Sequence, residues 1–441
     1  MNQVIKSQTP LPHDIALQLP LPEWLLIFIL ILSFLVHILF VNLMLGGSLI
    51  TLWYQIKGLK VKEYDQLANE LAKTITVNKS LAVVMGIAPL LTINTLYTIY
   101  FYTSNSLTGF MWIAVIPLVT IAFLLTYLHK YTWITLDNHK ALHICILSVA
   151  CLIFLFIPLI FLVNINLMLF PEKWAAVQGF ISALALPNVF PRYLHFILAS
   201  LAVTGLFIFW YFGRNSYKFD SKFKVISQYS VRRGAYTLTF VVSTIQFLIG
   251  PIVLLTLPSK GVGWNLVFVI LTGAVFALPA MYWMFKAITG KEDQMDKSFL
   301  KVVAFFSLTV IFMVSGRHIY RSNALGPHQR MMAAKTKIFL KASKEARQAA
   351  KVDDLSQEKD NRTKGEMLFA KNCSVCHHLD NRLVGPPITE MISIYRDNTK
   401  ELIDWIKKPG RKRMDGPPMP VPVNLTDEDR KDLARFILSK Q

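Results

Sequence analysis

Residues 24–47 read WLLIFILILSFLVHILFVNLMLGG and contain no Asp, Glu, Lys or Arg. An α-helix needs about 20 consecutive apolar residues to cross the hydrocarbon core of a bilayer, so this stretch predicts a membrane-spanning helix. Eight segments of this kind occur, at residues 22–53, 81–103, 107–128, 144–170, 193–212, 235–257, 264–285 and 300–318. The sequence therefore predicts an all-α fold in which residues 1–320 form a polytopic transmembrane bundle of about eight helices.

The charged residues are sorted as a membrane protein requires. Only 11 of the 27 acidic residues precede residue 320, and each lies in the N-terminal tail, between apolar segments or at the edge of one. A net charge of +19 would suggest nucleic acid in a soluble chain, but many basic residues lie in short loops beside the apolar segments, where membrane insertion favours them. We expect a lipid membrane as partner and no nucleic acid.

Lysine and arginine counts predict the orientation of the bundle, because basic loops stay on the cytoplasmic side. The gaps after segments one, three, five and seven hold 5, 2, 6 and 3 of them, and the gaps after segments two, four and six hold 0, 2 and 1. No basic region and small-residue cleavage site precede the first segment, so we expect it to remain as a helix. Both termini should lie on the outer side.

The composition changes after residue 320 to Lys, Ala, Glu and Gln, with no Pro or Gly between residues 329 and 362. Residues 321–362 are predicted to form a polar helical connector, with a disordered tether as the alternative. Residues 363–441 should then form a compact domain, small enough to need a stabilising cofactor.

The sequence CSVCH at residues 373–377 is the attachment pattern of a c-type haem. Two thiols at this spacing bond the porphyrin edge, and the adjacent imidazole binds the iron. The alternatives are a redox CxxC pair or half of a zinc site, but this domain contains no second cysteine pair. We predict one covalent haem c held by Cys373, Cys376 and His377.

The same domain resembles the class I cytochrome c family. The resemblance is carried by residues at that family's positions before and after the attachment pattern, which are Gly365, Leu368, Phe369, Gly385-Pro386-Pro387 and Thr426-Asp427-Glu428-Asp429. It implies that Met419, which precedes Pro420, is the sixth iron ligand, with Met414 as the alternative. It also implies assembly on the periplasmic side of a bacterial inner membrane, in agreement with the charge count.

Three histidines fall within the apolar segments, and ionisable residues at membrane depth tend to mark functional sites. His195 and His318 belong at the outer ends of two antiparallel helices, where they are expected to ligate one non-covalent haem b. Arginines at the same level can neutralise its propionates, namely Arg192, Arg317 and Arg321. His37 lies deeper and is expected to ligate a second haem b if one exists. The alternatives are an interfacial role for His318 and a hydrogen bond between helices for His37.

His129 and His143 flank the short gap after the third segment. They are placed to hold an inner haem, but Lys130 and His139 mark this gap as polar and basic. We therefore expect His129 and His143 to be solvated loop residues.

The membrane part resembles subunit I of the cytochrome bd quinol oxidases, chiefly over residues 22–212. The matching stretches are His37-Ile38-Leu39-Phe40, Leu45-Gly46-Gly47, Gly86-Ile87-Ala88-Pro89 and Leu194-His195-Phe196. The resemblance implies that His37 and His195 are haem ligands. Gly316-Arg317-His318 looks like a variant of a late Gly-Arg motif in that family.

Two departures from that family bear on function. Residues 107–128 contain no Asp or Glu, whereas the oxidases carry carboxylates in their third helix. The connection from Pro258 to Trp264 is short, whereas the oxidases have a long quinol-binding loop there. These departures put oxygen reduction and the usual quinol site in doubt.

We therefore expect a membrane electron-transfer protein with no catalytic residues of its own. One or two b haems should exchange electrons with the c haem, within a respiratory complex that has further subunits and a cytochrome as redox partner. The use of quinone and the direction of electron flow are left open. The alternatives are a bd-like terminal oxidase fed by its own cytochrome c domain and a membrane-anchored cytochrome c without membrane haem.

Overall fold

The computed structural model describes residues 19–357, 363–411, 417–422 and 424–440. The chain divides into two compact units, residues 1–337 and 338–441. The described residues of each unit form helices joined by turns and loops, with no strand among them.

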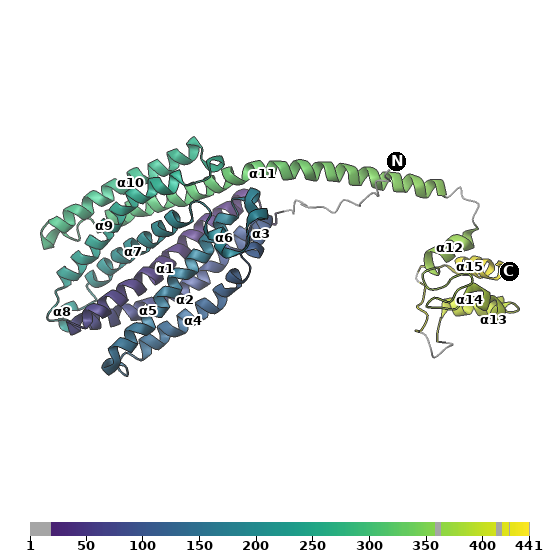
Figure 1. Cartoon of the computed structure of the whole chain (residues 1–441), viewed down its shortest axis with the longest axis horizontal. Helices are drawn as coiled ribbons and strands as arrows, with labels where there is room; N and C mark the ends of the chain where they lie inside the picture. The colour runs from purple at the N-terminus through teal and green to yellow at the C-terminus, as the bar shows by residue number, and fades with distance from the viewer. Residues whose placement is uncertain (1–18, 358–362, 412–416, 423, 441) are drawn as a thin grey trace. The chain divides into compact units, whose positions relative to one another are not determined.

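Seven helices of the first unit are long and apolar enough to cross a membrane, and they run side by side (Figure 1). They are α1 (Glu23–Gly58), α4 (Phe110–Tyr131), α5 (Lys140–Leu167), α7 (Val189–Gly213), α9 (Gln228–Leu255), α10 (Trp264–Thr289) and α11 (Phe299–Gln357). Short helices connect them, namely η1 (Asp137–His139), η2 (Pro171–Ala176), α6 (Phe180–Leu184), α8 (Phe219–Lys222), η3 (Ser259–Gly261) and η4 (Glu292–Gln294). The chain is a multi-pass membrane protein.

The sequence predicts one helix over the second apolar segment, residues 81–103, but the structure has two helices there. They are α2 (Lys62–Leu96) and α3 (Thr98–Thr108), which meet at an angle of 110°. Tyr97 at the break has non-helical backbone angles, and its buried ring packs with Tyr100 and Phe101. Aromatic packing thus overrides a continuous apolar pattern, and the bundle has eight crossings only if this bent pair counts as one.

Small residues let the first helices of the bundle approach closely. A Cβ atom added to Gly46 on α1 would lie 2.3 Å from the Ser200 carbonyl oxygen on α7, and one added to Gly205 on α7 would lie 2.2 Å from Thr239 Oγ1 on α9. Membrane helices use such residues because close backbone contact replaces the hydrophobic driving force that water supplies elsewhere. The contacts align α1, α7 and α9 along their lengths.

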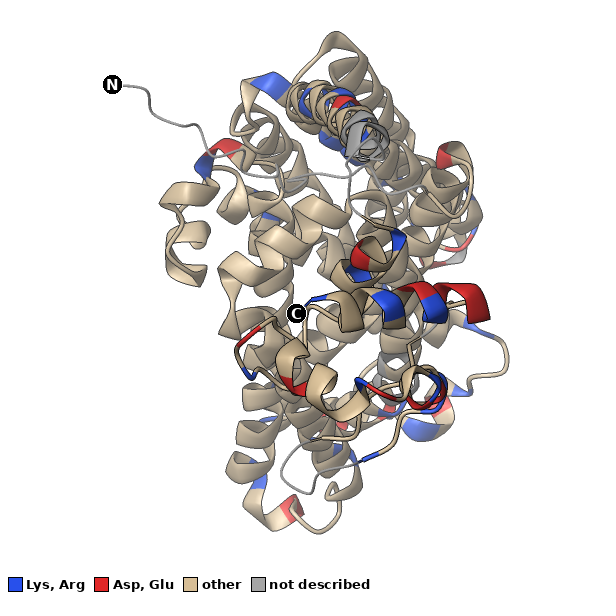
Figure 2. Cartoon of the chain, turned by 90° about the vertical axis from the view of Figure 1, so that its right-hand side faces the viewer, with Lys and Arg blue, Asp and Glu red and all other residues tan. Residues whose placement is uncertain are grey.

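Helix α11 continues without a break through the predicted connector as far as Gln357. Its apolar first part belongs to the bundle, and its later part carries exposed lysines such as Lys337 and Lys341. Figure 2 shows that Lys, Arg, Asp and Glu are sparse on the spanning helices and frequent at their ends and in the C-terminal unit.

The C-terminal unit contains α12 (Lys364–Asn372), α13 (Ile388–Tyr395), α14 (Thr399–Lys407) and α15 (Asp427–Ser439). Helices α12 and α15 pack at Gly365, where an added Cβ would lie 2.2 Å from the Asp432 carbonyl oxygen. Thr426 caps α15 in a reciprocal capping box with Asp429. Hydrogen bonds from Lys364 and Thr426 hold the pKa of Asp429 well below its usual range.

Candidate haem sites

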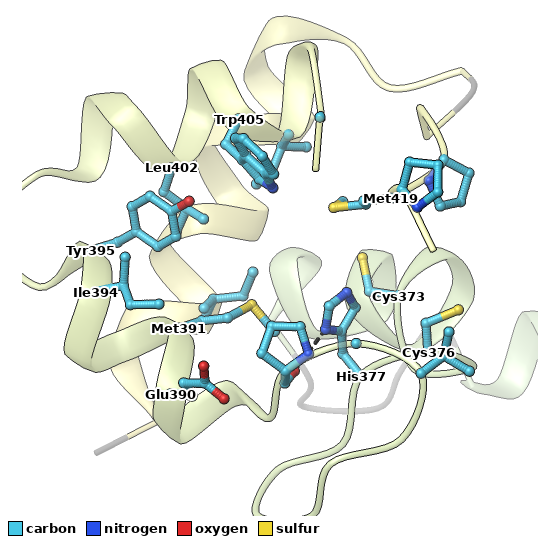
Figure 3. A pocket seen from close by; sticks show the side chains of 18 of the residues that line it. Cys373, Cys376, His377, Glu390, Met391, Ile394, Tyr395, Leu402, Trp405 and Met419 are labelled. Carbon is cyan, nitrogen blue, oxygen red and sulfur yellow. Dashed lines mark hydrogen bonds between the residues drawn. The ribbon is translucent and has the colours of Figure 1, made fainter. Parts of the chain in front are cut away.

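The C-terminal unit contains a cavity that brings together the predicted c-haem residues. Cys373, Cys376, His377 and Met419 all line it, together with apolar side chains from α13 and α14. Figure 3 shows the His377 ring and the Met419 sulfur pointing into this cavity from different segments of the chain. The arrangement fits a flat macrocycle that is bonded at one edge and ligated on both faces.

His377 is held in one orientation by its backbone surroundings. Its Nδ1 donates to the Pro386 carbonyl oxygen at 2.8 Å, which leaves Nε2 free to bind a metal. Gly385 lies directly against the ring, because a Cβ atom there would be 2.3 Å from His377 Cε1. A glycine is therefore required beside this histidine.

The two cysteines lie on one turn, where the Cys376 amide donates to the Cys373 carbonyl oxygen at 3.1 Å. Burial, with a smaller contribution from Cys376, raises the pKa of the Cys373 thiol to about 11. A catalytic redox pair needs a lowered thiol pKa, so this environment argues against that alternative. Among the described residues there is no group of three or more His, Cys, Asp or Glu side chains that could hold a metal ion.

Met419 is half-buried, and its amide donates to the Gly410 carbonyl oxygen at 3.3 Å. The alternative ligand, Met414, lies outside the described residues. A second methionine, Met391 on α13, also lines the cavity and was not expected from the sequence. Met391 lies on the apolar face of α13 and packs in the domain core, so we assign it to the core.

In the bundle, the structure places His37 and His195 at one depth. Ser200 on α7 donates to Asn42 Oδ1 on α1 at 2.9 Å, across a sequence offset of 158 residues. Gly46 also packs against Ser200 and Thr204, so the two helices run parallel in this register. The same offset relates His37 to His195. His37 is therefore no deeper than His195, contrary to the expectation from its position in the first segment.

His37 has the same backbone tether as His377. The hydrogen bond between its Nδ1 and the Ala82 carbonyl oxygen measures 2.9 Å, and Gly86 leaves room for the ring because a Cβ there would lie 2.9 Å from His37 Cε1. Such a bond fixes the ring and leaves Nε2 free for a metal. Ala82 and Gly86 lie one turn apart on α2. The sequence shows this spacing but does not indicate that His37 packs against it.

His195 and His318 share a different feature, because Nδ1 of each is buried without a hydrogen-bond partner among the described residues. Arg192 lies 5.8 Å from the ring centroid of Tyr320, which brings the first turn of α7 beside the part of α11 around Tyr320. His195 follows Arg192 by three residues and His318 precedes Tyr320 by two, so both belong to the same level.

The predicted arginines gather at this end of the bundle. Arg317 lies over Phe34 of α1, and Arg321 over Tyr97. The charges of Arg192 and Arg321 are near enough to act on Arg317. None of the three makes an ion pair with a carboxylate of the described residues, and the Nε atoms of Arg317 and Arg321 are buried without a partner there. The hydroxyls of Tyr320 and Tyr97 interact with Arg192 and Arg321, respectively, so tyrosine hydroxyls and, among the described residues, no carboxylates face these cations. Neighbouring cations without a carboxylate partner fit an anionic group such as a haem propionate.

The expectation for His129 and His143 is wrong. Both are almost completely buried, at 1% and 0% exposure, instead of solvated. Gln55 of α1 lies between their ring nitrogens, at 2.9 Å from His129 and 2.7 Å from His143. The polar sequence around them did not reveal this burial, because Gln55 is distant in the chain.

Comparisons with known proteins agree with this architecture. Residues 363–441 match the cytochrome c family model. The chain is similar to a chain in the structure of bd oxidase from Geobacillus thermodenitrificans, with a TM-score of 0.55 and 14% sequence identity, over 76% of this chain and 98% of that chain. No curated protein matches.

These findings define the class of protein, which is a membrane-spanning helical domain joined to a cytochrome c domain. More particularly, the helical domain is bd-oxidase-like in fold, and both resemblances expected from the sequence are confirmed. A cytochrome c domain implies a covalent haem, so the protein functions in haem-based electron transfer.

Proposed function

We propose that this protein carries electrons between haem b in its membrane bundle and haem c in its C-terminal domain. Haem iron supplies one-electron chemistry at a potential that is set by its axial ligands. In the C-terminal domain, Cys373 and Cys376 attach the porphyrin and His377 and Met419 ligate the iron. In the bundle, His37, His195 and His318 are the ligands.

The observation that carries the bundle assignment is the group of polar atoms left without partners at one level. Buried polar groups in native proteins are nearly always hydrogen-bonded, and exceptions point to a missing ion or ligand. Here the unpartnered atoms include the Nδ1 atoms of His195 and His318 and the Nε atoms of Arg317 and Arg321. A haem b with its propionates would supply both an iron and two anions to such a group.

The described spanning helices favour electron transfer over oxygen reduction. Reduction of dioxygen consumes protons at the iron itself, so an oxidase needs carboxylates or other ionisable groups close to the iron that deliver them there. Helix α4 contains no Asp or Glu, and the only acidic residue on α1 is Glu23 at its start. Electron transfer between ligated haems requires no such relay at the iron. We therefore propose that the protein does not reduce dioxygen by itself.

The protein is proposed to work in the inner membrane of a bacterium, with both termini on the periplasmic side. The domain boundaries proposed are residues 1–320 for the bundle, 321–362 for the connector and 363–441 for the cytochrome. Its partners would be further subunits of a respiratory complex and a soluble or subunit cytochrome, with a quinone as a second candidate donor. The short connection from Pro258 to Trp264 leaves no room for the long loop of the quinol oxidases.

A haem stain and a haemochrome spectrum of the purified protein test the proposal. We expect haem c with one or two haems b. Haem c alone would show that the bundle is only an anchor, and an additional high-spin or d-type haem with sustained oxygen consumption would favour the oxidase.

Single substitutions then assign the ligands. His195→Ala and His318→Ala should each remove the same low-spin b signal, whereas His37→Ala should affect a different haem if a second one is present. His139→Ala is the matched control, since His139 is exposed at the far end of the bundle. If only one of His195→Ala and His318→Ala removes the low-spin b signal, the two histidines do not ligate the same iron.

A further inference from the structure

A buried polar cluster lies at the end of the bundle that the charge count assigns to the cytoplasm. Four helices contribute to it, through Gln55 of α1, Asp65 of α2, His129 of α4 and His143 of α5. Each of these four side chains is at most 5% exposed. Ionisable side chains buried together in a membrane protein are costly, and they usually mark a functional site.

With the Gln55 amide oriented as in the structure, the hydrogen bonds are those of two neutral imidazoles. Gln55 Nε2 donates to His143 Nδ1 at 2.7 Å, and His143 Nε2 donates to the His129 carbonyl oxygen at 2.7 Å. His129 Nε2 donates to Gln55 Oε1 at 2.9 Å. Both rings are neutral in this arrangement, and Nδ1 of His129 is the nitrogen left to accept a proton.

The two rings stack with their centroids 4.1 Å apart and their planes 17° from parallel. Two axial ligands must approach an iron from opposite faces of a macrocycle, so stacked rings at this distance cannot hold a haem between them. They also cannot both carry a charge, because two cations at this separation repel strongly. The pair can therefore bind one proton and no more.

Charged groups connect this pair to the surface. Trp133 packs edge-on against both rings and donates from Nε1 to Asp65 Oδ2 at 3.2 Å. Lys140 lies 2.8 Å from Asp65 and 3.0 Å from the exposed Asp137. Lys62 is the other cation close enough to act on Asp137. Lys140 is near enough to act on both rings, and the carboxylates of Asp65 and Asp137, which share Lys140, are near enough to act on His143.

On the other side, a stripe of buried polar residues leads from the pair along α1. The stripe consists of Gln55, Thr51 and Ser48, which are four and three residues apart and therefore lie on one face of the helix. All three are 0% exposed. The Thr51 hydroxyl is buried without a hydrogen-bond partner among the described residues. Internal water occupies such polar positions in proteins. The stripe leads toward Asn42, which lies about 20 Å from Gln55 along the helix.

We propose that the His129–His143 pair is the proton uptake site of the bundle, and that Thr51 and Ser48 begin the route from it toward the haem level. This inference rests on the proposed function, because an electron on a haem b supplies the charge that the proton balances. When a reduced cytochrome or a quinol delivers one electron to ferric haem, the site binds one proton from the cytoplasmic side. On reoxidation the electron leaves and the proton is released.

The test measures proton uptake by the purified full-length protein as it is reduced anaerobically in weak buffer with a pH-indicating dye. His143→Gln removes the ring that Gln55 bridges. Thr51→Val removes only a hydroxyl at nearly constant volume, and it separates the route from the packing of the pair. His139→Gln is the matched control, since His139 lies one residue before Lys140 and is exposed. Haem spectra of each variant verify that the protein is assembled.

We expect His143→Gln to lose the proton uptake linked to haem b and Thr51→Val to slow it at least tenfold, with His139→Gln unchanged. Uptake at the wild-type extent and rate in both His143→Gln and Thr51→Val, with haem b present, would overturn this proposal alone. Absence of haem b from the wild-type protein would overturn the proposed function, and this inference with it.

Discussion

The substitution Gly385→Ala tests how the c haem is ligated, because it adds one methyl group beside the His377 ring. The new Cβ would lie 2.3 Å from Cε1, 2.6 Å from Nδ1 and 2.8 Å from Nε2, where ordinary contact begins at 3.4 Å. The ring must therefore move by about 1 Å, which breaks the 2.8 Å hydrogen bond to Pro386. The lost bond costs about 1 kcal/mol and the overpacking about 1–3 kcal/mol.

We expect Gly385→Ala to keep its covalent haem, since the two cysteines are untouched, but to lose the low-spin spectrum and bind added ligands at the vacated iron position. The free energy of unfolding of the domain should fall by about 2–4 kcal/mol by the same reasoning. Gly410→Ala is the control, because Gly410 lines the same cavity but a Cβ there would meet nothing nearer than 3.5 Å. A normal low-spin spectrum and normal stability in Gly385→Ala would refute the assignment of His377.

Three further predictions concern the same domain. Replacement of both Cys373 and Cys376 by Ala should abolish covalent haem in a denaturing gel while the protein still inserts into the membrane, since the spanning helices are specified by their own hydrophobicity. Met419→Ala should lower the potential of the c haem and open its iron to added ligands in a redox titration, and the same effect from Met414→Ala instead would identify the other methionine. Asp429→Asn should destabilise the domain at neutral pH in thermal unfolding, because hydrogen bonds from Lys364 and Thr426 lower the pKa of Asp429 in the folded state. A carboxyl group whose pKa is lower in the folded state stabilises the fold fully above its pKa in the unfolded chain, so the difference from wild type should be complete above about pH 4 and should shrink steadily below that pH, toward the pKa of Asp429 in the folded state; a difference that stays constant below that pH would contradict it.

Features with a strong local signal were predictable from the sequence. The length and hydrophobicity of the apolar segments predict spanning helices, whichever neighbours these helices pack against. The CSVCH pattern places two thiols and an imidazole on one turn. Thr426, directly before three acidic residues, has the local pattern of a helix cap, because an N-cap depends only on the next few residues. The cytochrome c domain and the multi-pass helical domain follow from such features.

Features that depend on distant contacts were not predictable. The break at Tyr97 arises from aromatic packing against other helices, and an apolar count cannot detect it. The burial of His129 and His143 depends on Gln55, which lies 74 and 88 residues away from them in the chain. The depth of His37 was misjudged because hydrophobicity locates a span but does not fix how two helices are aligned along their lengths.

The central claim is that electrons pass between a bundle haem and the c haem within one protein. The most direct measurement prepares the purified protein half-reduced without oxygen, perturbs the redox state by rapid reduction, and follows the b and c absorption bands without mediators. We expect the two bands to relax together at a rate independent of protein concentration, and His195→Ala to remove the b band that relaxes with the c band. Bands that relax independently, or at a rate that rises with protein concentration, would contradict electron transfer within the chain.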